Sequence, residues 1–180
     1  STAMKEAVKR AGIDPSVIND VRFGSCMEPY NALNIARVAS LDAGIPETST
    51  AVTINRVCIS GMEAVISGMA MIQAGLVDVV LAGGVEHMSG VAYGVQGARW
   101  GCRLQNQSFD DMMIEGLYCG SRLQPGLEQG PVKEGPVIEA MKGKPYIMGH
   151  TAELVAQMYN ISREEMDAVA LRSHNNAERA

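Results

Sequence analysis

The 180-residue chain carries 15 lysine and arginine residues against 20 aspartate and glutamate residues, a formal net charge of −5. This balance disfavours a general nucleic-acid-binding role, and the 4% aromatic content disfavours a surface that stacks on bases. The 47% hydrophobic content and the 19 glycines are typical of a tightly packed α/β protein of about one domain.

The four cysteines are Cys26, Cys58, Cys102 and Cys119, and they form no CxxC pair and no zinc-like spacing. We therefore expect no disulfide scaffold, no metal site and a reducing compartment. The chain shows no signal peptide and no run of 18 apolar residues. From this we expect a soluble, cytoplasmic protein without a membrane segment.

The first half of the chain alternates between helical and strand patterns. Apolar residues at helical spacing predict a helix over residues 3–11 that ends at Gly12. Residues 21–26 are predicted to form a short strand, and residues 31–43 a second helix. Residues 50–54, which are β-branched apart from Ala51, predict a second strand, of the kind that is buried in a sheet.

The alternation continues with a helix predicted over residues 60–74 and a strand over residues 76–82. Apolar residues occupy most of the circumference of this helix, which indicates burial on nearly all sides. The strand is almost continuously apolar, as strands of parallel sheets are. The order of these elements predicts a parallel sheet with right-handed crossovers.

The second half of the chain is predicted to be less regular. Residues 89–148 are rich in glycine and scattered polar residues, with one short helix near residues 112–117 and prolines at 125, 131, 136 and 145 that keep the rest irregular. Helices are predicted over residues 151–159 and from residue 162 onward, the latter with a Ser162–Glu165 capping box. Both ends of the chain lie inside helical patterns, so we expect a fragment of a longer protein.

Cys58 is predicted to lie in the turn between the strand over residues 50–54 and a helix that begins near Ser60. Ser60 and Glu63 have the spacing of a capping box at that helix start. A helix N-terminus favours negative charge and therefore the thiolate form of a nearby cysteine, which is the form that attacks a carbonyl carbon. The same pattern also fits a small cysteine buried in the core, and the local residues leave both interpretations open.

Six stretches, taken in chain order, resemble the N-terminal half of a thiolase. Each glycine-rich piece is weak by itself, whereas the series is highly specific and spans nearly the whole chain. The stretches are Ala11-Gly12-Ile13-Asp14-Pro15 with Val17, Val21 and Gly24; Ala36-Arg37 with Ala43-Gly44-Ile45-Pro46; Asn55-x-x-Cys58-x-Ser60-Gly61; Ala82-Gly83-Gly84-Val85-Glu86-His87-Met88-Ser89; Met112-x-Ile114-x-Gly116-Leu117; and Met148-Gly149-x-Thr151-Ala152-Glu153.

The resemblance implies an α/β fold of the layered αβαβα thiolase type, of which this chain holds the first half and an irregular α-rich loop domain. We divide the chain by this likeness into an N-terminal core at 1–90, a loop domain over the substrate site at 91–160 and a helix that leads back to the core at 161–180. A first strand that precedes Ser1 is expected to be missing from the core, which would leave an unpaired sheet edge.

The resemblance also implies acyl transfer between CoA thioesters, by thiolysis of a 3-ketoacyl-CoA or by condensation of two acetyl-CoA molecules in fatty acid metabolism. Cys58 is then the nucleophile that carries the acyl group, and its backbone N–H is expected to be one donor of an oxyanion hole, worth roughly 3 kcal/mol of barrier. Leu117 and Met148 match positions that contact the acyl-pantetheine arm; the alternative is that they pack within the loop domain. CoA is a substrate, no other cofactor is expected, and the family forms homodimers or homotetramers.

Several features limit what the resemblance implies. The Asn-Glu, Gly-His-Pro and Cys-x-Gly motifs of thiolase C-terminal halves are absent, so we expect these 180 residues alone to be inactive. Glu86 and His87 are not expected to be catalytic, and His150 and His174 have no evident partner. The segment 118–147 is longer than in many thiolases, which leaves acyl chain length open, and the residues do not decide between degradative and biosynthetic directions.

Two other functions remain as alternatives. The first is a non-catalytic acyl-CoA-binding or interaction module that kept the fold. The second is a related condensing enzyme, such as a 3-ketoacyl synthase or a hydroxymethylglutaryl-CoA synthase, which shares the nucleophilic cysteine. The string Gly83-Gly84-x-Glu86-x-Met88-Ser89 disfavours this second alternative.

Overall fold

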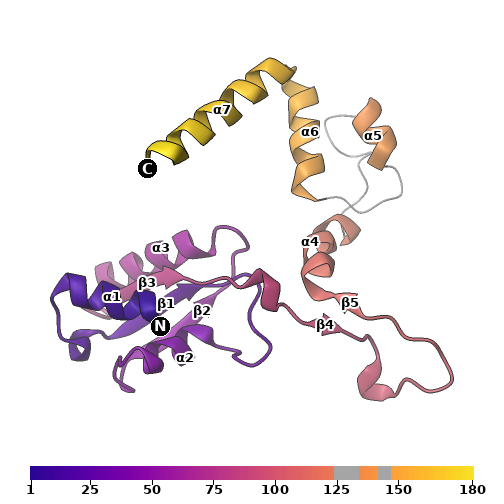
Figure 1. Cartoon of the computed structure of the whole chain (residues 1–180). Coiled ribbons are helices and arrows are strands. Elements are labelled where there is room, and N and C mark those ends of the chain that lie inside the picture. The colour runs from indigo at the N-terminus through magenta and orange to yellow at the C-terminus, as the bar shows by residue number, and fades with distance from the viewer. Residues whose placement is uncertain (124–133, 142–146) are drawn as a thin grey trace. The chain divides into compact units, whose positions relative to one another are not determined.

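A computed structural model describes residues 1–123, 134–141 and 147–180 of the chain (Figure 1). The chain forms two compact units, Ser1–Met113 and Ile114–Ala180, and each is described by itself. The predicted three-part division at residues 90 and 160 stays a prediction, because it concerns the roles of the segments in a whole enzyme.

The first unit contains a parallel sheet with the strand order β2-β1-β3, and the predicted parallel sheet is therefore confirmed. A short antiparallel pair, β4 with β5, follows it. The elements of this unit are α1 (Thr2–Ala11), β1 (Asp20–Gly24), α2 (Ile35–Asp42), β2 (Thr50–Ile54), α3 (Ser60–Gln73), β3 (Val80–Gly84), β4 (Tyr93–Gly94) and β5 (Asp110–Asp111), with 3₁₀ turns at Pro15–Val17, Met88–Gly90 and Ala98–Trp100.

Side-chain hydrogen bonds explain where several elements begin and end. Gly12 ends α1 in the left-handed conformation, at φ 66°, as predicted. The helix predicted over residues 31–43 begins only at residue 35, because the Asn34 side chain caps it by accepting from the Arg37 N–H at 3.1 Å. The strand predicted from residue 76 begins only at residue 80, because the backbone N–H groups of Asp78 and Val79 donate to the Asn19 side chain instead.

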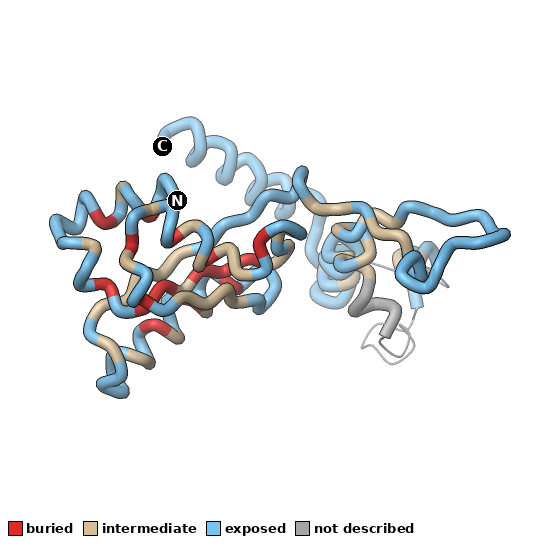
Figure 2. The backbone as a smooth tube through the Cα atoms, turned by 90° about the horizontal axis from the view of Figure 1, so that it is seen from below, coloured by how far each residue is buried: buried red, intermediate tan, exposed pale blue. Residues whose placement is uncertain are grey.

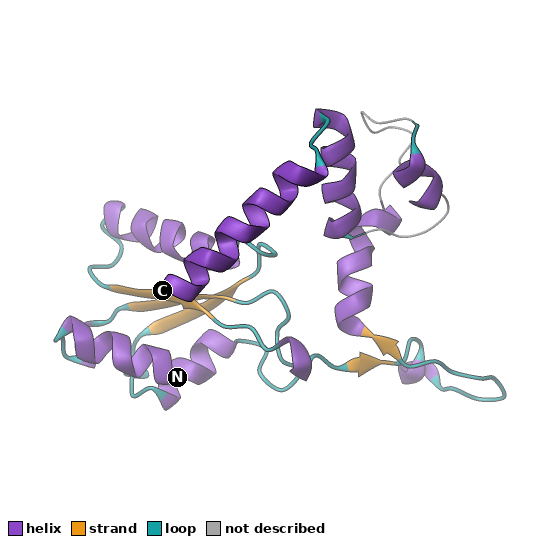
Figure 3. Cartoon of the chain, turned by 45° about the horizontal axis from the view of Figure 1, so that its top comes forward, coloured by secondary structure: helices purple, strands orange, loops and turns teal. Residues whose placement is uncertain are grey.

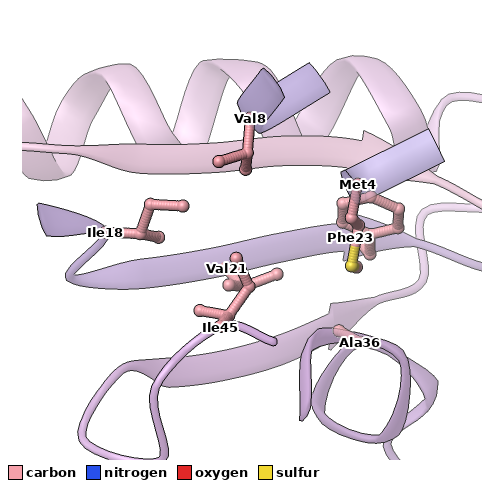
Figure 4. Packing of buried hydrophobic residues seen from close by; sticks show 7 residues of the cluster. All are labelled: Met4, Val8, Ile18, Val21, Phe23, Ala36 and Ile45. Atoms are coloured by element: carbon pink, nitrogen blue, oxygen red, sulfur yellow. The ribbon is translucent and has the colours of Figure 1, made fainter. Parts of the chain in front are cut away.

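One face of the sheet packs against α1 and α2. Alternate residues of β1, Val21 and Phe23, point to this face, as the twofold repeat of a strand requires. Figure 4 shows the buried cluster that results, which consists of Met4, Val8, Ile18, Val21, Phe23, Ala36 and Ile45. Helices lie on both sides of the three strands in Figure 3, so the sheet forms the middle layer of the first unit.

The opposite face of the sheet packs against α3 through small residues. A Cβ atom at Gly68 would lie 2.9 Å from Val80 Cγ1, so the helix approaches β3 closely there. Only Ser60, Ala64 and Gly68 of this helix are buried. Among the three strands only β1 contains buried residues, and Figure 2 shows the buried positions as short red stretches within the first unit.

The prediction that α3 is buried on nearly all sides is wrong for this structure. The side chains that face away from the sheet are open to solvent; Met62 is 61% exposed, Val65 56% and Met69 52%. The physical reason is that one sheet covers only one stripe of a helix. The first unit places no second layer over α3.

A buried ion pair lies on the α3 face of β1. Arg22 Nε donates to Asp20 Oδ2 at 2.7 Å, and the Asp20 and Arg22 side chains are only 4% and 17% exposed. Thr50 Oγ1 donates to the other carboxylate oxygen of Asp20 at 2.6 Å, so both oxygens are satisfied. A buried charge that loses its partner is costly, because its desolvation is no longer offset.

We expect Asp20→Asn to destabilise the protein by about 1–2 kcal/mol, since Arg22 loses its counter-charge while the Thr50 hydrogen bond is kept. The free energy of unfolding, from urea denaturation, measures the effect. The exposed pair of Arg10 with Glu6 is the matched control, and Glu6→Gln should cost below about 0.5 kcal/mol. Equal effects of the two substitutions would contradict the assignment of a stabilising role to the buried pair.

The second unit is helical in its described residues, with α4 (Met112–Leu123) entering it from the first unit, α5 (Pro136–Met141), α6 (Met148–Tyr159) and α7 (Arg163–Arg179). The short helix predicted at residues 112–117 is confirmed and continues to Leu123. Pro136 was expected to keep its segment irregular, but it starts α5, because proline suits the first turn of a helix.

The helices predicted from residues 151 and 162 are confirmed, although α6 begins earlier, at Met148. Asn160 ends α6 at φ 52°, and the predicted capping box then opens α7. The Ser162 N–H donates to Glu165 Oε2 at 2.8 Å, and the Glu165 N–H donates to Ser162 Oγ at 3.2 Å. The Ser162 hydroxyl also donates to Glu165 Oε2, at 3.0 Å, and the backbone and hydroxyl bonds of Ser162 to this carboxylate hold the pKa of Glu165 below its ordinary value.

Every helix in the described ranges is too short or too polar to cross a membrane. No group of three or more histidine, cysteine or acidic side chains in the described part is placed to hold a metal ion.

Candidate active site

Cys58 lies in the turn between the end of β2 and the start of α3, as predicted. Cys58 is exposed, so its interpretation as a buried core cysteine is wrong for this structure. The first-turn N–H groups of α3, which have no partners inside the helix, lie directly after it in the chain. A thiolate at this place is therefore next to the positive end of a helix dipole.

The predicted capping box of Ser60 and Glu63 does not form. Ser60 is the first residue of α3 instead of its cap, and its hydroxyl turns back to the preceding loop, where it accepts from the Arg56 N–H at 2.8 Å. Glu63 forms an ion pair with the guanidinium of Arg56. Ser60 and Glu63 have the spacing of a capping box, but the Ser60 hydroxyl bonds to the Arg56 N–H and the Glu63 carboxylate pairs with the Arg56 guanidinium instead.

The backbone before Cys58 adopts an unusual conformation. Val57 has φ 54°, in the left-handed region that β-branched residues rarely occupy. The Val57 N–H donates to Asn55 Oδ1 at 3.0 Å, and the Val57 carbonyl accepts from Ser60 Oγ at 2.5 Å. These two bonds fix the direction in which the chain enters Cys58.

An open pocket of about 310 Å³ lies beside Cys58. Residues from the carboxyl ends of all three strands line it, including Ser25 after β1, Val57 after β2 and Glu86 after β3. In open α/β sheets, ligands bind at the carboxyl ends of the strands. The pocket is therefore at the place where this architecture favours a binding site.

Glu86 connects the ends of β1 and β3. Its carboxylate accepts from the backbone N–H of Cys26 at 2.8 Å and from that of Met27 at 2.9 Å. Burial, with smaller contributions from the charges of Glu86 and Cys58, raises the pKa of the Cys26 thiol. Both carboxylate oxygens of Glu86 thus have backbone partners, which fits the expectation that Glu86 is structural.

His87 lines a pocket of about 240 Å³ that it shares with Met27 and Asn31, and it is not among the residues that line the pocket of Cys58. His150 accepts from the Ile147 N–H through Nδ1 at 3.3 Å at the start of α6. His174 is on α7, whose residues are all exposed. Both of these histidines belong to the second unit, which is described separately from Cys58.

The predicted substrate contacts Leu117 and Met148 belong to the second unit. Leu117 is half-buried in α4, and Met148 begins α6 with 56% exposure. Their relation to Cys58 stays a prediction, because the two units are described separately. Residues 124–133 and 142–146 of the long segment 118–147 lie outside the described residues, and so does any role predicted for them.

The sequence interpretation did not identify Asn55 and Ser60 as the side chains that hold the turn at Val57, or Glu86 as the residue that joins the segment after β1 to the end of β3. A partial signal was present, since an asparagine side chain commonly accepts from the N–H two residues later and forms a local turn. The contacts of Glu86 had no such signal, because they join residues 59 and 60 positions apart.

Comparison with known proteins gives a consistent result. The family model described as "Thiolase, N-terminal domain" matches residues 1–126 and 127–180. The chain is 37% identical over 177 residues to "Acetyl-CoA acetyltransferase" of Syntrophomonas wolfei, and 36% identical over 180 residues to "Probable acetyl-CoA acyltransferase" of Staphylococcus aureus strain MRSA252. These matches cover 98% and 100% of this chain but 40% of each relative.

A solved structure agrees with these relatives. The crystal structure of the Bacillus anthracis acetyl-CoA acetyltransferase superposes with a TM-score of 0.79 at 41% sequence identity. The superposition covers 98% of this chain and 39% of that one. The chain thus spans about two fifths of the length of the relatives that it matches.

Proposed function

Because the chain belongs to the thiolase family and has the α/β fold of that family, we propose that the whole protein transfers acyl groups between CoA thioesters through Cys58. The observation that carries the proposal is the place of Cys58, exposed at the start of α3 beside a pocket formed by three strand ends. The names of the relatives supply the substrate class, acetyl-CoA and other acyl-CoA molecules.

In the proposed thiolysis, the Cys58 thiolate attacks the 3-keto carbon of a 3-ketoacyl-CoA. The bond between C2 and C3 breaks, the electron pair leaves on acetyl-CoA as its enolate, and the enolate takes up a proton. A second CoA thiolate then attacks the acyl-cysteine, releases the shortened acyl-CoA and regenerates the Cys58 thiolate. Claisen condensation of acetyl-CoA is the same sequence in reverse.

The start of α3 supplies the electrostatic contribution in this proposal. Negative charge develops on the carbonyl oxygen during each attack, and the Cys58 N–H is the proposed donor to it, supported by the dipole of α3. Leu117 and Met148 are proposed to contact the acyl-pantetheine arm and exclude water. CoA is a substrate here, and the proposal needs no metal and no other cofactor.

Further properties of the whole protein follow from the same proposal. It acts in fatty acid metabolism in the cytoplasm, and it assembles as a homodimer or homotetramer. The alternative to acyl transfer is a non-catalytic acyl-CoA-binding module that keeps the fold.

Alkylation by iodoacetamide separates the two candidates. We expect Cys58 in the whole protein to react at least about tenfold faster than Cys102, because Cys58 lies next to the N-terminus of α3, which stabilises nearby negative charge. Cys102 is the matched control, since it is also exposed. Peptide mass spectrometry gives both rates.

Acetyl-CoA should protect Cys58 from this reagent, because it occupies the pocket or acylates the thiol, and it should leave Cys102 unprotected. Equal rates at the two cysteines, unchanged by acetyl-CoA, would favour the binding module.

The isolated 180 residues are expected to show no thiolytic turnover, because thiolases carry further acid and base groups in a part that these residues lack. The measurement is acetyl-CoA release from acetoacetyl-CoA by a purified fragment of residues 1–180, compared with the whole protein at equal concentration. A full thiolytic rate from the fragment would refute the expectation.

A further inference from the structure

The turn before Cys58 is strained, and packing of its side chains does not explain why it persists. Val57 is one of three residues other than glycine with positive φ among those that the structure describes. Such a conformation is unfavourable for a β-branched residue. The Val57 side chain is 60% exposed, so contacts with the core do not hold it in place.

Hydrogen bonds hold the turn instead. Two come from the backbone, since the Ile59 N–H donates to the Arg56 carbonyl at 3.3 Å and the Ser60 N–H to the Val57 carbonyl at 3.1 Å, and the others come from two side chains. Asn55 Oδ1 accepts from the Val57 N–H at 3.0 Å, two residues later in the chain. Ser60 Oγ accepts from the Arg56 N–H at 2.8 Å and donates to the Val57 carbonyl at 2.5 Å. The N–H groups of Arg56 and Val57 and the carbonyl of Val57 therefore all have hydrogen-bond partners around the strained residue.

Asn55 is itself anchored to a neighbouring strand end. Its Nδ2 donates to the Cys26 carbonyl at 3.0 Å, and the Cys26 and Met27 N–H groups donate to Glu86. The side chain of Asn55 thus joins the segment after β1 to the turn after β2, and Glu86 joins the same segment to the end of β3. Through Asn55, the sheet therefore restrains the backbone conformation of Val57.

We propose that Asn55 is a positioning residue that holds Val57 in the left-handed conformation and thereby places Cys58 at the N-terminus of α3. Without the Asn55 bond, Val57 relaxes toward negative φ, which turns the following residue away from the helix start. The inference deepens the proposed function and rests on it, since the placement matters to the reaction only if Cys58 is the nucleophile.

The test uses the whole protein and the alkylation rate of Cys58, which requires no turnover. We expect Asn55→Ala to lower this rate about tenfold, since the strain of a left-handed residue is then uncompensated. Adding Val57→Gly should restore it to within about threefold, because glycine adopts positive φ at no steric cost. Adding Val57→Ala should not restore it, because alanine keeps the Cβ atom that causes the strain.

The double variants separate positioning from a general loss of stability. Thermal unfolding is followed for each variant, and if Asn55→Ala does not fold, the glycine and alanine additions are made on Asn55→Ser, whose hydroxyl keeps a weaker bond to the Val57 N–H. An unchanged alkylation rate in the Asn55 variant, or equal rescue by glycine and alanine, would overturn the proposal.

Acyl transfer is measured on the same samples to keep the two proposals apart. A wild-type protein without turnover refutes the proposed function, whereas the glycine-specific rescue of alkylation supports the role of Asn55 whatever the turnover is.

Discussion

Cys58→Ala is expected to lower the thiolysis of acetoacetyl-CoA by the whole protein by about 10⁴-fold, because the residue that forms the acyl intermediate is lost. The loss should be entirely in catalysis, since Cys58 is exposed and its side chain contributes little to the core. The free energy of unfolding should change by less than about 0.5 kcal/mol. Acetyl-CoA release and urea denaturation on the same preparation give the two values.

Cys102→Ala is the matched control, because it removes another exposed thiol from the first unit. It should leave the thiolysis rate within about twofold, as surface substitutions commonly do. A Cys58→Ala protein that keeps a tenth or more of the wild-type rate would rule out an acyl-cysteine intermediate at this residue.

Gly24→Ala is expected to destabilise the protein by about 3 kcal/mol, at the upper end of what overpacking costs. A Cβ atom at this position would lie 2.4 Å from Ser60 C, 2.5 Å from Gly61 N and 2.6 Å from Ser60 O. All three are backbone atoms, so no rotamer change relieves the clash, and either β1 or the start of α3 must move. The alkylation rate of Cys58 should fall as well, because the start of α3 that is displaced by the clash lies next to Cys58.

Gly61→Ala is the matched control, because it adds a methyl group at the same helix start without meeting β1. A Cβ atom there has no neighbour within 4 Å, and the residue lies in the first turn of α3. Alanine is the better helix former, so this substitution should be neutral or stabilise the protein by up to about 1 kcal/mol. Urea denaturation measures both variants, and a Gly24→Ala protein as stable as Gly61→Ala would show that β1 and α3 are not in this close contact.

The elements of the first unit were predictable because their signals are local. Residues 50–54, β-branched apart from Ala51, favour a strand by themselves, and the small and apolar residues from 60 onward favour a helix. Their order then restricts the sheet to parallel pairing. The boundaries were less accurate where a distant side chain intervenes, as Asn19 does at the start of β3.

The incorrect predictions share one cause. In each case a local pattern allowed a contact that the neighbouring residues in the fold do not provide. Ser60 and Glu63 have capping-box spacing, but Arg56 offers both a backbone N–H and a guanidinium to them. Likewise, the apolar circumference of α3 indicated burial all round, whereas the sheet covers only the stripe that contains Ala64 and Gly68. The spacing of residues in the sequence limits which contacts are possible. The contacts that form depend on the residues that the fold brings near.

The sequence by itself determined the family, the order of the elements and the place of Cys58 between a strand and a helix, because these depend on residue types at short and regular spacing. Only the tertiary structure decided how that place is held. The bond of Asn55 to the Cys26 carbonyl and the bonds of Glu86 to the Cys26 and Met27 N–H groups exist because parallel pairing brings three strand ends, far apart in the chain, to one edge of the sheet. No local pattern encodes such contacts, since their partners come from strands that are joined by whole helices.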